Sequence, residues 1–188
     1  QCFKIEEQSP EKKTITCSRS FAKEICEINE LEEAISSYCA DAARRLRQEK
    51  LLANLVCVFV ESGRFKNDRY FNCASAYLQR KSDQTFEIIK LAKSILRNIF
   101  KDKILYKKAG VILGILASGH ALVQDDLFQS NKPDKKSNLS HIVDALNHKY
   151  GNGSLLYAAE GIKKDWVMSR NMCSKRYTTR WSDLPIAK

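Results

Sequence analysis

The chain has 188 residues, of which 44% are hydrophobic and 29% charged, with 7 Gly and 3 Pro. This composition excludes collagen-like and intrinsically disordered chains and predicts a folded protein of one domain or little more. No stretch approaches the roughly 18 to 20 consecutive apolar residues that span a bilayer, so a soluble protein is expected. Lys and Arg number 32 against 22 Asp and Glu, a net charge of +10. That surplus attracts polyanions, nucleic acid first among them.

The seven cysteines form no CxxC pair, and no secretory signal precedes them, so reduced thiols and a cytoplasmic location are expected. Cys17, Cys57 and Cys73 lie in apolar or alternating stretches and are interpreted as core residues. The three histidines have no metal-ligand spacing, and no metal site is indicated. Because the chain begins with Gln1 and not Met, we expect a piece of a longer protein.

A strand is predicted over Lys13 to Phe21, which is rich in Thr, Ile and Cys. A helix follows, from a capping-box-like pair of Asn29 and Glu32 to about Lys50. The β-branched and aromatic stretch Leu51 to Val60 then predicts a second strand. The polar residues 62–68 predict a turn after it.

The alternating stretch Tyr70 to Leu78 predicts the partner strand of a hairpin. Ser82 or Asp83 is expected to cap a second helix that runs to Phe100 and leaves Lys93 and Arg97 in solvent. Lys107 to Leu116 predicts the last strand, with one packed face made by Ala109, Val111, Leu113 and Ile115.

The predicted order is β, α, β, β, α, β, which is the split βαβ, ferredoxin-like topology. The predicted fold class is therefore α+β, with a four-stranded antiparallel sheet and both helices on one face. The other face is left for a partner, and basic or hydroxyl residues are expected on it or at its edges, namely Ser18, Arg19, Ser20, Arg64, Lys66, Arg69, Lys107 and Lys108. Such side chains suit phosphates. Since no Gly-aromatic-Gly-aromatic strand is present, contact with a duplex backbone is favoured over single-strand readout, and a merely solvated face is the alternative.

Residues 1–118 are interpreted as this domain, 119–137 as a linker and 138–188 as a small C-terminal extension. The extension is expected to begin with a helix over Asn138 to Lys149 that Gly151 and Gly153 end. Within the linker, Leu127 and Phe128 are large apolar residues in a polar stretch. They would gain free energy by entering a pocket, unless they pack back on the domain. The stretch from Ser154 onward is expected to be a small subdomain that depends on a partner.

Several separated motifs resemble, in order from about Thr16 to Lys188, the C-terminal part of the UmuC family of Y-family translesion DNA polymerases, the error-prone, SOS-induced polymerase V type. They are Cys17 to Phe21, Ala42 to Arg47, Tyr106 to Leu113, the Gln124 to Phe128 motif, and a tail pattern that includes Trp166, Arg170, Tyr177 to Thr179 and Asp183-Leu184. The resemblance implies that residues 1–118 are a little finger, which grips primer-template DNA with its open sheet. It implies backbone contacts for Ser18 to Ser20, Lys107 and Lys108, and weaker ones for Arg64, Lys66 and Arg69.

The resemblance also implies that Gln124, Leu127 and Phe128 bind the β sliding clamp, although Asp125 departs from the family's Leu. For the extension it implies two partners, a UmuD-type processed dimer and the recombinase RecA. No catalytic residue is expected in this chain. Nucleotidyl transfer with Mg²⁺ is expected in a palm domain of the parent polymerase. The alternative is a ferredoxin-like protein-interaction or regulatory module without DNA binding.

Overall fold

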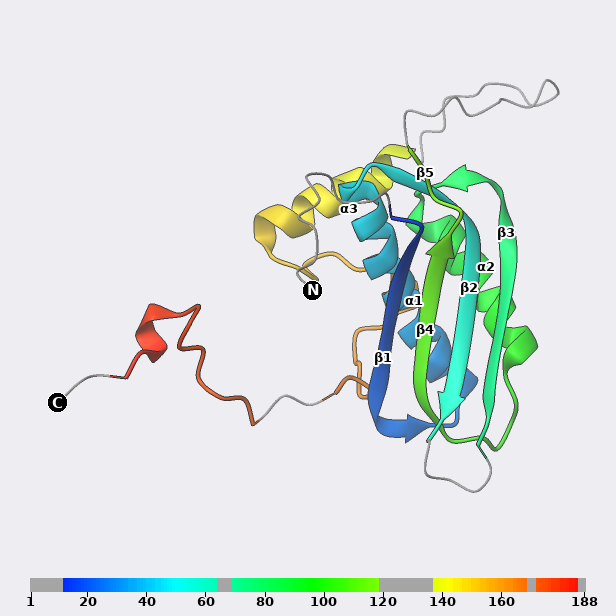
Figure 1. The fold of residues 1–188 in the computed structure, drawn as a ribbon, viewed down its shortest axis with the longest axis horizontal. Helices are drawn as coiled ribbons and strands as arrows, with labels where there is room; N and C mark the ends of the chain where they lie inside the picture. Colours follow the sequence, from blue (N-terminus) through cyan, green and yellow to red (C-terminus); the bar gives the residue numbers. More distant parts are fainter. Residues whose placement is uncertain (1–11, 64–68, 119–136, 169–171, 186–188) are drawn as a thin grey trace, which may run out of the picture.

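The computed structural model describes residues 12–63, 69–118, 137–168 and 172–185, and its core is an antiparallel sheet covered on one face by two helices (Figure 1). The elements of the core are β1 (Thr14–Ile25), α1 (Ile28–Gln48), β2 (Leu51–Ser62), β3 (Phe71–Ser82), α2 (Thr85–Ile99) and β4 (Tyr106–Gly114). The strands are ordered β1-β4-β2-β3 in the sheet. The predicted βαββαβ, α+β fold is therefore confirmed.

The core forms between the helices and the residues of the strands that alternate toward them. On β2 these are Val56, Val58 and Val60, all fully buried, and their partners on β4 are as fully buried. α1 packs on β1 and β4, and α2 on β2 and β3. This follows from the two-residue period of a strand, which sends alternate side chains to opposite faces. Among the helices of the described residues, none is long and apolar enough to cross a membrane.

The last strand is shorter than expected. β4 ends at Gly114, and Ile115 has a φ of +51° and is 48% exposed, so its predicted place on the packed face is wrong. The change of direction at Ile115 lets the two-residue β5 (Ala117–Ser118) pair with Leu51 and Leu52 at the start of β2. The predicted alternation of Ala109, Val111 and Leu113 is confirmed, since all three are fully buried.

Neither helix begins as predicted. α1 starts after Glu27, with no side-chain cap, so Asn29 lies inside its first turn and does not cap it. The Glu32 carboxylate instead accepts from Arg97 Nε (2.7 Å) and Lys93 Nζ (3.1 Å) of α2. Lys93 and Arg97 thus pair with Glu32 and are not simply left in solvent. Burial would raise the pKa of Glu32, but the two cationic donors outweigh it and hold that pKa below its usual value.

α2 follows the N-cap Gln84, and Ser82 contributes only its Oγ, which accepts from the Gln84 backbone N–H at 3.1 Å. Of the three cysteines interpreted as core, Cys17 is buried, Cys57 is half-buried and Cys73 is exposed. The core interpretation is therefore wrong for Cys57 and Cys73, because both lie on the uncovered face of the sheet, Cys73 on its edge strand β3.

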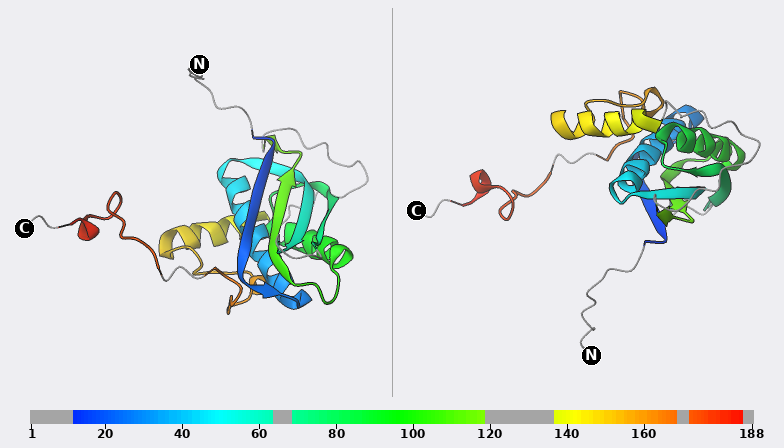
Figure 2. Two further views of the ribbon diagram at one scale, coloured as in Figure 1. Left: turned by 60° about the horizontal axis from the view of Figure 1, so that its bottom comes forward. Right: turned by 90° about the horizontal axis from the view of Figure 1, so that it is seen from above.

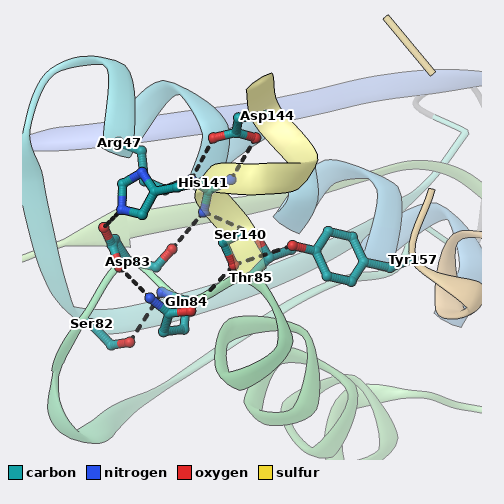
Figure 3. Close-up of polar contacts among 9 residues, drawn as sticks. All are labelled: Arg47, Ser82, Asp83, Gln84, Thr85, Ser140, His141, Asp144 and Tyr157. Carbon is teal, nitrogen blue, oxygen red and sulfur yellow. Dashed lines mark hydrogen bonds and ion pairs between the residues drawn. The ribbon is translucent and has the colours of Figure 1, made fainter. Parts of the chain in front are cut away.

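Helix α3 (Ser137–Tyr150) docks where α1 ends and α2 begins, through polar contacts (Figure 3). The Arg47 guanidinium of α1 is its anchor, and the Arg47 side chain is 3% exposed. It donates to the Asp144 carboxylate of α3 (2.6 and 2.9 Å), the Asp83 carbonyl oxygen (2.6 Å) and Thr85 Oγ1 (3.0 Å). Ser140 adds a second contact, donating to Gln84 Oε1 at 3.3 Å and accepting from the Tyr157 hydroxyl at 3.2 Å.

The buried side of α3 is mixed and not wholly apolar. Ser140 is 1% exposed and Val143 and Leu146 are half-buried, whereas Leu139, Ile142 and Tyr150 are 53%, 54% and 65% exposed. Gly151 and Gly153 end the helix with φ of +105° and +90°, as predicted.

The chain then returns to the core along α1. Trp166 is 6% exposed and meets the rings of Phe21 (6.2 Å) and Tyr38 (5.7 Å) edge-on, and its carbonyl accepts from the Ala22 N–H at 3.0 Å. Residues up to Trp166 therefore complete the core of the domain. The final described stretch, 172–185, lies apart from that core (Figures 1 and 2).

Candidate nucleic-acid interface

The sheet has one face that no helix of the described residues covers, and Figure 1 looks onto it. We call it the open face. Cross-strand pairing places four residues of each strand on it, because paired residues share a face. They are Thr14, Thr16, Ser18 and Ser20 of β1; Lys108, Gly110, Ile112 and Gly114 of β4; Leu55, Cys57, Phe59 and Glu61 of β2; and Phe71, Cys73, Ser75 and Tyr77 of β3.

The β1 edge of the open face is a column of hydroxyl groups. Ser18 and Ser20 lie in it, as the sequence led us to expect. Arg19 does not: it pairs with Ala109, which is fully buried under the helices, so Arg19 is at the sheet edge on the helix side. Burial raises the pKa of the Tyr38 hydroxyl of α1, and the positive charge of Arg19 opposes that rise, as expected of a side chain on this side.

A close packing of three residues fills the centre of the open face. A Cβ placed on Gly110 would lie 2.5 Å from Phe59 Cζ and closer still to Ser18 Cβ. The Phe59 ring therefore occupies the space over the Gly110 backbone, on which Ser18 of β1 also borders. Only glycine leaves this space at that position.

The Phe59 ring connects the centre of the face to its cation. Lys108 Nζ lies 5.8 Å from the centroid of the Phe59 ring. On the other side of Phe59, the centroid of the Phe71 ring lies 6.3 Å from that of Phe59. Phe71 and Tyr77 are 55% and 65% exposed. Lys108 is half-buried and thus lies next to the Phe59 ring, where a bound phosphate would meet its charge in a partly desolvated setting.

Two further predicted contact residues lie at the end of the sheet. Lys107 sits at a register shift of β4 and donates to the Ala22 carbonyl at 3.3 Å. Arg69 donates to Glu61 Oε1 at 3.2 Å, with 58% of the Arg69 side chain exposed and 8% of the Glu61 side chain. The structure therefore brings Ser18, Ser20 and Lys108 together on the open face, and places Lys107 and Arg69 beside it.

Five predicted site residues lie outside the described residues. Arg64 and Lys66 belong to the loop between β2 and β3, and Gln124, Leu127 and Phe128 to the stretch between β5 and α3. Within the described ranges, no group of three or more His, Cys, Asp or Glu side chains is arranged to hold a metal ion.

The open face is less basic than the sequence suggested. Among its described positions it carries Lys108 and Glu61 with four hydroxyls on β1 and exposed rings on β3. Sequence reasoning missed Phe59 as a central residue, because β2 is apolar on both faces and shows no alternation. The glycine at position 110 was the available signal, since a glycine inside a strand marks a close approach.

Comparison with known proteins gives two family matches that divide the chain. Residues 12–127 match the family described as the impB/mucB/samB family C-terminal domain. Residues 137–187 match a domain of unknown function, DUF4113. The division falls between β5 and α3.

Curated relatives match along nearly the whole chain. Protein UmuC of Salmonella typhimurium is 39% identical over 97% of this chain, and Protein MucB of the same organism is 33% identical over 99%. The chain spans 44% of the length of each. Among solved structures, the little finger domain of PolIV in its complex with a β-clamp processivity factor aligns over 63% of this chain and 96% of that one, with 15% identity and a TM-score of 0.44.

Proposed function

This chain belongs to the impB/mucB/samB family of Y-family DNA polymerase homologues, the family of SOS mutagenesis, and we propose that it is the region that grips DNA and tethers the polymerase to a sliding clamp. In this proposal residues 1–118 are the little finger, and the open face lies against primer-template DNA. The observation that carries it is the family match over 12–127, which includes every strand of the open face.

The chemistry of the open face supports backbone contact. Ser18 and Ser20 offer hydroxyl donors to phosphate oxygens, and Lys108 offers a charge that Phe59 holds in place. Hydroxyls, backbone amides and cations fix a duplex in register without reading its sequence. A face that contacts phosphates and not base edges suits a polymerase that must pass damaged bases.

A direct test measures the binding of fluorescent primer-template DNA by anisotropy. Lys108→Glu is expected to weaken binding and to lower the slope of log affinity against log salt by about one phosphate contact. The matched control is Lys90→Glu on α2, an exposed lysine on the covered side of the sheet. Equal binding by the two variants would overturn the assignment of the open face.

The clamp contact is a separate part of the proposal, and we assign it to Gln124, Leu127 and Phe128. Its support is the motif at these positions, with a Leu-Phe pair that suits an apolar cleft. The test is saturable binding to a bacterial β clamp, lost in the Leu127→Ala, Phe128→Ala double variant. Binding that survives the double variant would remove the tethering role of this motif.

One observation favours a second candidate, a protein-interaction or regulatory module without DNA affinity. Among its described positions the open face holds one lysine beside Glu61, with Phe71 and Tyr77 more than half exposed, and exposed rings are also common in protein interfaces. Charge reversal at Lys107 and Lys108 separates the candidates. DNA binding falls under the first, whereas nothing measurable changes under the second.

Other roles are proposed on family resemblance alone. We assign nucleotidyl transfer and its Mg²⁺ to the part of the relatives that this chain does not span, and the C-terminal extension to a UmuD-type processed dimer and RecA. The proposed location is the cytoplasm, at the nucleoid.

A further inference from the structure

The stretch 172–185, which we call the C-terminal segment, is locally ordered although it lies apart from the core (Figure 1). The Arg176 N–H donates to Asp183 Oδ2 at 3.1 Å, and the Arg176 carbonyl accepts from the N–H groups of Thr179 (3.2 Å) and Arg180 (3.0 Å). The N–H of Leu184 then donates to the Trp181 carbonyl at 3.2 Å. These bonds close two successive turns, so the backbone of the segment is held in a defined shape.

The two turns present aromatic rings to solvent. Trp181 is 89% exposed and Tyr177 is 51% exposed, and neither ring contacts another described aromatic ring. A tryptophan that is held by ordered backbone but buries almost none of its own surface has a free face for a ligand. In contrast, Trp166, only fifteen positions earlier, is 6% exposed in the core.

Cations alternate with these rings along the segment. Lys175, Arg176 and Arg180 are exposed, and none of them forms an ion pair with another described residue. The one carboxylate of the segment, Asp183, accepts the Arg176 N–H and is the one half-buried residue in it. The segment therefore offers ring faces and unpaired cations together, on a chain whose net charge is +10.

We propose that the C-terminal segment is a binding site for single-stranded nucleic acid, in which Trp181 and Tyr177 stack on bases while Lys175, Arg176 and Arg180 meet phosphates. Stacking platforms interleaved with cations are the general chemistry of single-strand binding, and they need no base sequence. The site is separate from the open face and does not rest on the proposed duplex grip. It gives a ligand class to part of a region that matches a domain of unknown function.

The test uses the full chain and a labelled oligo(dT) of about twelve nucleotides. Binding is expected to quench tryptophan emission and to be weakened about tenfold or more in Trp181→Ala and in Tyr177→Ala, as loss of a stacked base predicts. The matched control is Tyr150→Ala on α3, a tyrosine that is 65% exposed against 51% for Tyr177 and lies beside Lys149, and this variant should change binding less than twofold. Each of Arg176→Ala and Arg180→Ala is expected to lower the salt slope by about 0.7, and Lys163→Glu, at an exposed lysine outside the segment, controls for general charge.

Two outcomes overturn the proposal. One is oligo(dT) binding that is unchanged in both aromatic variants. The other is no binding in the unmodified chain, which would leave the exposed rings to a protein partner. Because the segment makes no part of the core, thermal unfolding should be unchanged in these variants, and loss of binding cannot then be attributed to loss of fold. The duplex-binding test with Lys108→Glu tests the open face and is decided independently of this result.

Discussion

The Arg47 guanidinium lies against the Asp144 carboxylate, with Nε 2.6 Å from Oδ2 and Nη2 2.9 Å from Oδ1 (Figure 3). This two-pronged contact joins α1 to α3 across 97 positions of the chain. Since the Arg47 side chain is 3% exposed and the Asp144 side chain 25%, the pair is largely removed from water. It attaches the C-terminal extension to the core through charge, where most helices use apolar contact.

Asp144→Ala is therefore expected to be costly. It leaves a buried guanidinium without its counter-charge, and the expected loss is about 3 kcal/mol in the free energy of unfolding, measured by urea denaturation. Asp41→Ala is the control, because the Asp41–Arg44 pair has both side chains about one-third exposed and should contribute less than about 1 kcal/mol. Similar losses in the two variants would show that α3 does not depend on the Arg47 pair.

Glu32 gives the domain a dependence on acid pH. Because its folded pKa is lowered by Arg97 and Lys93, the stabilisation is complete above the unfolded pKa of about 4.5 and is lost as the pH falls through the lower folded value. Glu32→Gln should thus lower stability at pH 7, by about 1 to 3 kcal/mol. The difference from the unmodified chain should shrink as the pH falls below about 4.5. Glu30→Gln, at an exposed position of the same helix, should show only a few tenths of that effect; a difference for Glu32→Gln that is constant with pH would contradict the prediction.

Gly110 and Gly114 form a matched pair on β4. Gly110→Ala forces its Cβ against Ser18 and the Phe59 ring, and is expected to cost about 1 to 3 kcal/mol in thermal or chemical unfolding. Gly114→Ala meets its nearest neighbour, Leu55, at 3.4 Å and should be close to neutral. If both substitutions are equally tolerated, Phe59 does not pack over Gly110 as described.

Ile115 is a β-branched residue with a left-handed φ of +51°. Ile115→Gly removes that strain and is expected to be neutral or to raise the melting temperature slightly. Ile142→Gly is the control: it is similarly exposed, at 54% against 48%, but lies in helix α3, where glycine should cost about 1 kcal/mol or less relative to other residues. A clear loss of stability in Ile115→Gly would show that the Ile115 side chain contributes packing that outweighs its backbone strain.

The sequence predicted the features that depend on the regular spacing of apolar residues within one stretch of chain. The strands with one apolar face and the two amphipathic helices follow from alternation at two and 3.6 residues, and their order alone defined the fold class. It placed Ser18, Ser20 and Lys108 correctly for the same reason. Arg19 lies between Ser18 and Ser20, so the same alternation puts it on the helix side with Cys17 and Phe21, which the expected set of contact residues did not take into account.

Contacts between distant segments could not be predicted. From the sequence, Arg47 is expected to be one of several exposed cations at the end of a helix. Only the structure shows that α3 lies over it. Trp166 follows no hydrophobic period, and its burial depends on the specific shape of the surface made by Phe21 and Tyr38. Such interactions join residues that are far apart in the chain, and no single stretch of sequence contains both partners.

The attachment of α3 also bears on the stretch that carries the proposed clamp motif. Ser118, on one side of that stretch, pairs with Leu51, and Asp144, on the other side, contacts Arg47, so the described residues that flank the motif belong to one body. If the motif binds a clamp as proposed, the chain connects the clamp to that body on both sides. Such a double connection limits the rotation of the two proteins about each other more than a single one would.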